Sequence, residues 1–149
     1  MGKKGFTTIE LIVVLILIGI IASIGFPRLR QGLEKQRIRN TKALLATMVA
    51  TARGTAVQRG CVATLNVATD SVWVTACGLV GNPPPASVLV GTAKRVKTDV
   101  NVTLNSSSPT ITYDPRGIRL NFQPTTIRVI GPTYQDSVVI NELGKVKRQ

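Results

Sequence analysis

The sequence contains no histidine, and only seven of its 149 residues are acidic. General acid–base catalysis most often uses histidine, and zinc sites are commonly built from histidine and cysteine. The few carboxylates are scattered along the chain, and no nucleophile stands near a basic partner in the sequence. The composition therefore argues against an enzyme, a metal site and a resident cofactor.

Aromatic residues are also scarce, at 4% of the chain, whereas 19 lysines and arginines give a net charge of +12. A low aromatic content argues against a stacking platform for tight recognition of single-stranded nucleic acid. The positive charge favours a polyanion or an anionic lipid as partner. The alternative is a basic surface with no such partner.

Charged residues are absent from a long apolar run, Leu11 to Phe26, which directly follows Glu10. A bilayer needs about 20 apolar residues, so the run is close to the length of a membrane span. A carboxylate inside a membrane costs about 2.5–3.5 kcal/mol on insertion scales, so Glu10 needs a partner. The run fits a cleaved secretory signal, a plain anchor, or an anchor whose glutamate pairs with a free amino group of another chain. No clear A-x-A cleavage site follows it.

Residues 3–11, which read KKGFTTIEL, resemble the class III signal of type IV pilins and pseudopilins. The resemblance implies that a membrane prepilin peptidase removes residues 1–5 by cutting after Gly5, and that the new N-terminus, Phe6, is methylated. It assigns to Glu10 a pairing with the Phe6 amine of a neighbouring subunit in a filament, and to Pro27 a helix kink. It also implies a single-pass protein of the bacterial inner membrane, with its head in the periplasm before incorporation into a pilus or pseudopilus.

The distribution of basic residues conflicts with that orientation. Two lysines precede the apolar run and six basic residues follow it closely, namely Arg28, Arg30, Lys35, Arg37, Arg39 and Lys42. The positive-inside rule alone would place the larger part of the chain in the cytoplasm. The resemblance and the cysteines favour the periplasm instead.

The fold expected from the pattern is α+β and pilin-like, with a long N-terminal helix packed on an antiparallel β head. We expect one helix from about Phe6 to Val57, with residues 6–27 in the membrane, 28–60 as its amphipathic continuation and 61–149 as the head. Gly25, Pro27 and Gly32 are candidate kinks, and Gly60 is the expected stop. Helical spacing predicts a buried stripe of Leu45, Met48, Val49, Ala52 and Ala56. The expected solvated side carries Arg37, Lys42, Arg53 and Arg59.

The first two strands are expected at residues 61–67 and 71–77, joined by a turn at 68–70. Pairing Val67 with Ser71 places Cys61 opposite Cys77, a geometry that can accept a disulfide. Such a bridge suits an oxidising compartment, and the alternative is two buried free thiols. Residues 81–85 form a loop. Later strands are expected at residues 88–90, 100–104, 110–113, 118–122, 126–130 and 137–140, with Trp73 and Tyr113 in the core or in hairpins.

Three further patterns resemble the GspH/FimT group of pilin-like proteins. They are ARGTAVQRG at residues 52–60, YDPRG at 113–117 and GKVKR at 144–148. The group implies two functions. FimT-like minor pilins prime or cap type IV pili and bind incoming DNA during natural transformation, whereas GspH-like minor pseudopilins serve type II protein secretion.

The basic tail favours the first function. The tail resembles the group's glycine-basic-x-basic motif and comprises Gly144, Lys145, Lys147 and Arg148. Lysines and arginines on phosphates give salt-dependent affinity without sequence preference. The motif usually carries arginines, so the lysines keep the charge but lose bidentate geometry. A second basic group, Lys94, Arg95 and Lys97, is expected in a loop that extends the surface. The alternative is an ordinary solvated tail. The implied partners are other pilins, the peptidase, the membrane and DNA.

Overall fold

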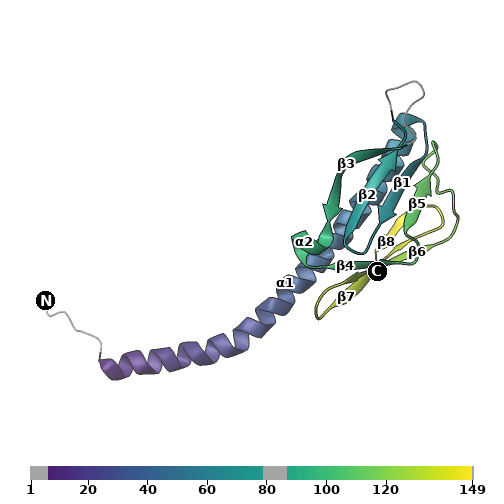
Figure 1. The fold of residues 1–149 in the computed structure, drawn as a ribbon. Helices are drawn as coiled ribbons and strands as arrows, with labels where there is room; N and C mark the ends of the chain where they lie inside the picture. The colour runs from purple at the N-terminus through teal and green to yellow at the C-terminus, as the bar shows by residue number, and fades with distance from the viewer. Residues whose placement is uncertain (1–6, 79–86, 149) are drawn as a thin grey trace.

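The computed structural model describes residues 7–78 and 87–148, and it is dominated by one helix, α1 (Thr8–Arg59). Thr7 caps the helix by accepting a hydrogen bond from the backbone N–H of Glu10. At the other end, Gly60 adopts the left-handed conformation expected of a helix stop, with φ of 63°. The helix continues unbroken through Pro27 and curves instead of breaking (Figure 1).

The two halves of α1 have different surroundings. The run from Leu11 to Phe26 is exposed, and the helix is long and apolar enough to cross a membrane. The C-terminal half packs on the head, while the N-terminal half projects away from it (Figure 1). The predicted stripe is confirmed, since all five of its members are buried: Leu45, Met48, Val49, Ala52 and Ala56.

Two of the basic residues expected on the solvated side of α1 are in fact engaged. Nζ of Lys42 lies 2.6 Å from a carboxylate oxygen of Asp136, and the side chain of Lys42 is only 12% exposed. Arg59 donates a hydrogen bond to the carbonyl of Cys77. The expectation fails because helical periodicity marks the apolar face but does not reveal polar partners that other strands bring to its margin.

The head consists of two four-stranded sheets in which all paired strands are antiparallel. The first has the order β3 (Val88–Arg95), β2 (Ser71–Ala76), β1 (Ala63–Val67), β5 (Thr110–Tyr113). The second has the order β4 (Thr103–Ser106), β6 (Thr125–Ile130), β7 (Gln135–Ile140), β8 (Val146–Arg148). A short helix, α2 (Val96–Val100), joins β3 to β4. Both sheets contact α1, whose buried stripe forms the centre of the core. The expected α+β arrangement, a long N-terminal helix packed on an antiparallel β head, is confirmed.

The register of β1 and β2 differs by one residue from the expected one. Val67 pairs with Val72, not with Ser71. The N–H of Ala68 donates to the carbonyl of Ser71, so only Thr69 and Asp70 form the turn. This register places buried residues of both strands on the same face, whereas the expected one would have paired Val67 with a polar residue.

Other boundaries also shift. Lys94 and Arg95 belong to β3 and Lys97 to α2, so the predicted basic loop is wrong. Val100 ends α2 instead of starting a strand. Residues 118–122 form no strand, and only Arg119 pairs with Tyr113 in a single bridge. The expected loop at residues 81–85 lies outside the described residues.

Candidate nucleic-acid interface and assembly helix

The basic tail lies on β8, at the edge of the second sheet. Val146 is half-buried, whereas Lys145 and Lys147 on either side of it are exposed. Lys147 pairs with Val139 of β7, and the N–H of Lys145 donates to the side-chain oxygen of Asn141. The tail therefore presents two lysine side chains to solvent from a backbone that is hydrogen-bonded to the head.

Gly144 anchors the tail and is itself buried. The hydroxyl of Tyr113 donates a hydrogen bond of 3.3 Å to the Gly144 carbonyl. Gly144 has a φ of 76°, and a Cβ at this position would overlap ring atom Cε1 of Tyr113. The sequence motif predicts Gly144 among the DNA-contacting residues, but in the structure its backbone docks the tail on a buried tyrosine. Tyr113 itself lies in the core, as expected, and burial raises the pKa of its hydroxyl.

The turn that follows Tyr113 is held by Asp114. The Asp114 carboxylate accepts hydrogen bonds from the N–H groups of Ile118 (2.8 Å) and Arg116 (3.0 Å) and from the Arg116 guanidinium. These bonds, led by that from Ile118, hold the pKa of Asp114 below its usual value.

The same turn packs on the end of α1. Gly117 has a φ of 75°, and a Cβ on it would come within 3.0–3.2 Å of the side chains of Val57 and Arg53. Tyr113 then reaches from this turn to Gly144. The three local patterns therefore form a chain of contacts: residues 52–60 contact residues 113–117, and residues 113–117 contact residues 144–148. Together they form a connected support that fixes the tail relative to α1.

A buried arginine completes this support, and the sequence reasoning missed it. Arg119 is 2% exposed, and its guanidinium donates to Oγ1 of Thr125 at 2.5 Å and to the Asn141 carbonyl at 3.5 Å. Within the described residues its Nε has no hydrogen-bond partner. Burial lowers the pKa of this guanidinium. No local pattern marks Arg119, because its partners are the first residue of β6, Thr125, and the carbonyl of Asn141, which follows β7.

Arg128 adds to the basic face of the second sheet. Along β6, Arg128 shares a face with Thr126, which pairs with Val139, the partner of Lys147. Arg128 is exposed, while Asp136 of β7 lies on the opposite face and pairs with Lys42 of α1. The outward face therefore carries Arg128 and Lys147 without a facing carboxylate among the described strand residues. The alternation of apolar and polar residues at 126–130 is the sequence signal that indicates an outward-facing Arg128.

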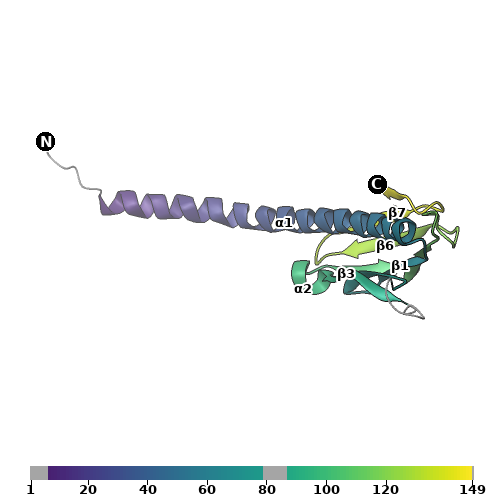
Figure 2. The ribbon, with the colours of Figure 1, turned by 90° about the horizontal axis from the view of Figure 1, so that it is seen from above.

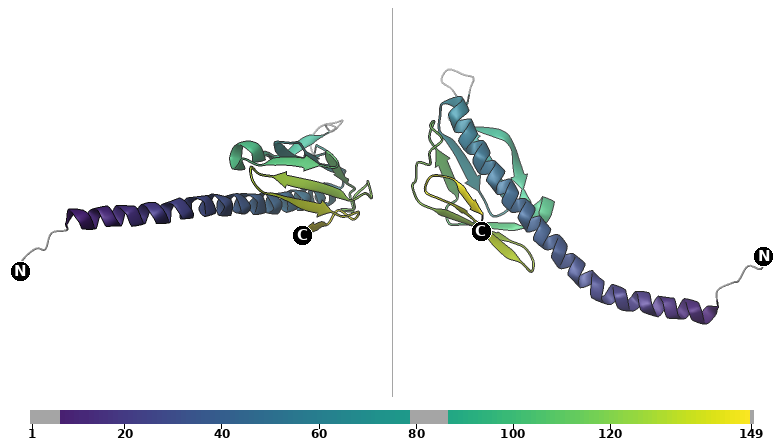
Figure 3. Two further views of the ribbon diagram at one scale, coloured as in Figure 1. Left: turned by 90° about the horizontal axis from the view of Figure 1, so that it is seen from below. Right: turned by 180° about the vertical axis from the view of Figure 1, so that it is seen from behind.

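The second basic group does not extend this surface. Lys94, Arg95 and Lys97 are exposed on β3 and α2. α1 runs between these elements and β7 with the C-terminal strand (Figure 2), and the same separation is visible in Figure 3. The two basic groups lie on different flanks of the head because β3 and β8 are edge strands of different sheets.

Trp73 is half-buried on the outward face of β2, in the hairpin with β1, which is one of the two places expected for it. It lines a hollow of about 740 Å³ together with Asn66, Asn105 and Thr110. The residues that line this hollow carry no charge, so the tryptophan does not interleave with the basic residues. The single indole of the chain is therefore separate from the tail surface.

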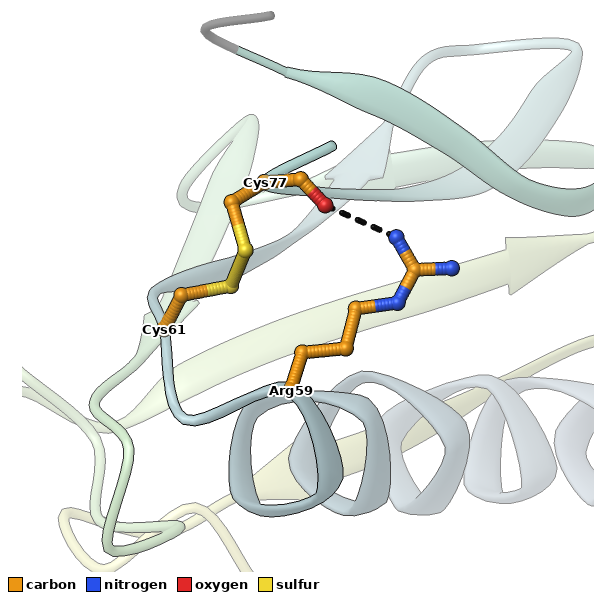
Figure 4. The surroundings of a disulfide bond; sticks show 3 residues. All are labelled: Arg59, Cys61 and Cys77. Atoms are coloured by element: carbon orange, nitrogen blue, oxygen red, sulfur yellow. Dashed lines mark hydrogen bonds between the residues drawn. A yellow bond between two sulfur atoms is a disulfide. The ribbon is translucent and has the colours of Figure 1, made fainter. Parts of the chain in front are cut away.

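The disulfide between Cys61 and Cys77 is present, with 6.2 Å between the two Cα atoms. Because the register is shifted by one, the cysteines flank β1 and β2 instead of pairing directly. Figure 4 shows that the Arg59 guanidinium reaches the Cys77 carbonyl, at 2.8 Å, from the last turn of α1. The bridge therefore ties the helix end and the first hairpin together.

The residues expected to act in assembly are on the exposed half of α1. Glu10 lies in the first turn and is exposed, and Pro27 lies within the helix. Gly5 and Phe6, the predicted processing residues, lie outside the described residues. In the described part of the chain, no group of three or more histidine, cysteine or acidic residues could hold a metal ion.

A long, apolar N-terminal helix whose second half packs on a small antiparallel head defines the pilin-like class of proteins. The crystal structure of the type IV minor pilin FimU from Pseudomonas aeruginosa shares this fold, with a TM-score of 0.60 at 12% identity over 78% of this chain and 90% of FimU. The minor pseudopilin EpsH of the Vibrio cholerae type II secretion system aligns with a TM-score of 0.57 at 8% identity, over 76% and 93%.

The family model described as type II transport protein GspH matches residues 43–144. The match spans more than half of the chain, and the chain belongs to the GspH family. No curated protein sequence matches the chain. Members of this pilin-like family are structural subunits that assemble into filaments, which agrees with the minor pilin or pseudopilin role expected from the sequence.

Proposed function

We propose that this minor (pseudo)pilin is a FimT-like subunit that primes or caps a type IV pilus and binds DNA through its tail during natural transformation. The observation that carries the proposal is the exposed pair Lys145 and Lys147 on the docked tail. Arg128 lies on the same outward face of the sheet, and Asp136 is turned to the other face. Docking lowers the entropy that the tail loses on binding.

The chemistry of this surface fits the phosphate backbone and not the bases. Lysine ammonium groups act as point charges on phosphates and do not read sequence. Trp73, the only tryptophan, lies in a separate uncharged hollow. The surface therefore suits weak, salt-sensitive binding of DNA of any sequence, which uptake of incoming DNA requires.

A DNA titration of the full-length protein in neutral detergent tests this function. In the variant K145A/K147A we expect weaker binding to every sequence tested and a salt slope lower by about 1 for each lysine removed. The matched control is K94A/K97A, which removes the same charge from the other flank and should keep most of the affinity. Fluorescence anisotropy at several salt concentrations measures both quantities.

An equal loss of DNA affinity in the two variants would show that binding depends only on the net charge of the protein. No binding of the wild type at low salt would contradict DNA recognition and leave the alternative, a GspH-like pseudopilin of type II secretion. The family model's description and the likeness to EpsH support that alternative. Its basic surface would then contact neighbouring subunits or secreted protein.

Assembly is proposed to depend on Glu10. The carboxylate stands at the edge of an otherwise uncharged apolar run, so it is stabilised when it pairs with the Phe6 amine of a neighbouring subunit. We expect the variant Glu10→Ala to be made and inserted at normal levels but to enter filaments poorly. Quantification of the subunit in sheared filaments and in membranes measures this, and normal incorporation would contradict the pairing.

Processing is proposed to remove residues 1–5 and to methylate Phe6, leaving the head of the mature protein in the periplasm. We expect the intact mass of protein extracted from membranes to match a chain that begins at a methylated Phe6. A mass that retains Met1 would contradict the pilin pathway. A strain without prepilin peptidase provides the uncut reference.

A further inference from the structure

A basic stretch of α1 lies directly beyond the apolar run. Arg28, Arg30, Arg37 and Arg39 are all exposed, and Glu34 is the only acidic residue among them. At a rise of 1.5 Å per residue, Arg30 stands about 6 Å and Arg37 about 16 Å beyond Phe26 along the axis. Helical side chains lean toward the N-terminus, so Arg37 leans back toward the membrane. The headgroup layer of a bilayer is about 5–7 Å deep on each side. Arg28 and Arg30 therefore lie at headgroup depth, whereas Arg37 starts beyond that layer and leans back toward it.

Two of the arginines line a groove between α1 and the head. Arg30 and Arg37 are seven residues apart, so they lie on one face of the helix, with Leu33 between them. The groove has a volume of about 300 Å³, and Val100 and Pro132 supply apolar parts of its opposite wall. Two cations beside an apolar wall match a phosphate attached to a glycerol.

Glu34 also lines the groove, but its carboxylate is occupied by the turn between β6 and β7. It accepts hydrogen bonds from the N–H groups of Thr133 (2.6 Å) and Tyr134 (2.9 Å) and from the Thr133 hydroxyl. These bonds, led by that from the Thr133 hydroxyl, lower the pKa of Glu34. The charge of Arg37 also helps to lower the pKa of Glu34, but within the described residues Arg30 and Arg37 form no ion pair. The groove therefore keeps a positive charge, and Glu34 holds one of its walls in place.

We propose that this groove binds the headgroup phosphate of an anionic phospholipid while the subunit is held in the membrane before assembly. The inference rests on the proposed function only in requiring that α1 spans the membrane. It accounts for basic residues on the head side of the apolar run, where the positive-inside rule does not place them. The groove holds them at the surface by a specific lipid contact.

Native mass spectrometry of the full-length protein from micelles that contain equal amounts of phosphatidylglycerol and phosphatidylcholine tests the proposal. We expect the wild type to retain phosphatidylglycerol selectively. In the variant R30Q/R37Q retention should fall by about twenty-five-fold, because the contact of each groove arginine with an anionic headgroup contributes roughly fivefold. In the matched variant R28Q/R39Q, which removes the same charge from positions about 200° away around the helix, retention should stay close to the wild type.

Three outcomes overturn the proposal. The wild type could retain both lipids equally, or the two double variants could lose phosphatidylglycerol to the same extent, which would indicate general charge attraction. Excess inorganic phosphate could also displace the lipid, which would make the groove a general phosphate site. None of these readouts depends on DNA or on filament assembly, so they separate this inference from the proposed function. A chain recovered without any micelle would instead contradict the membrane span.

Discussion

Replacing Gly144 with alanine is expected to lower the free energy of unfolding by about 2–5 kcal/mol. The left-handed backbone at this position costs a residue with a Cβ about 1–2 kcal/mol. The added Cβ would also overlap the ring of Tyr113, and overpacking a buried contact costs about 1–3 kcal/mol more. Denaturant unfolding of the full-length protein in detergent, followed by circular dichroism, measures the change.

Gly91→Ala is the matched control for this prediction. Gly91 has a φ of 72°, close to the 76° of Gly144, but a Cβ on it would meet open space. It should therefore cost only about 1–2 kcal/mol, the backbone part of the penalty. Equal losses in the two variants would show that the contact between Tyr113 and Gly144 contributes little. The contact with Tyr113 would then not be the reason why a glycine is required at residue 144.

The helix and its buried stripe could be predicted because both depend on local periodicity. Ile38 and Leu45 to Ala56 follow helical spacing, and every one of the stripe residues expected to be buried is buried. The register of β1 and β2 was also within reach of the sequence. Buried residues at 63, 65 and 67 and at 72, 74 and 76 pair only if Val67 lies opposite Val72. A register that places Cys61 directly opposite Cys77 differs from the observed one by one residue.

The rest of the site depends on contacts that no local pattern carries. The Tyr113 hydroxyl meets Gly144 across 31 positions, and Arg119 meets the Asn141 carbonyl across 22. The separation of Lys94 and Lys97 from the tail likewise follows from strand order, which places β3 and β8 in different sheets. Charge counted along the sequence therefore overestimated the size of the basic surface. Its support by a buried tyrosine and a buried arginine became visible only in the fold.

The double variant C61S/C77S is expected to lose about 3 kcal/mol of stability. The disulfide joins residues 16 apart, and closing a loop of about this length reduces the entropy of the unfolded chain by an amount worth about 3 kcal/mol. The bridge also positions the Cys77 carbonyl that accepts the hydrogen bond from Arg59. Denaturant unfolding of the oxidised wild type and of the variant measures the difference.

Reduction of the wild type is the control, because it removes the same bond without changing the sequence. A reductant should destabilise the wild type by about the same amount and leave the variant unchanged. A wild type that is equally stable with and without reductant would contradict a structural role for the bridge. Disulfides persist in oxidising compartments such as the periplasm and are rare in the cytosol. A head whose stability falls markedly on reduction is therefore adapted to the periplasmic side, and that dependence would outweigh the opposite orientation indicated by the basic residues that follow the anchor.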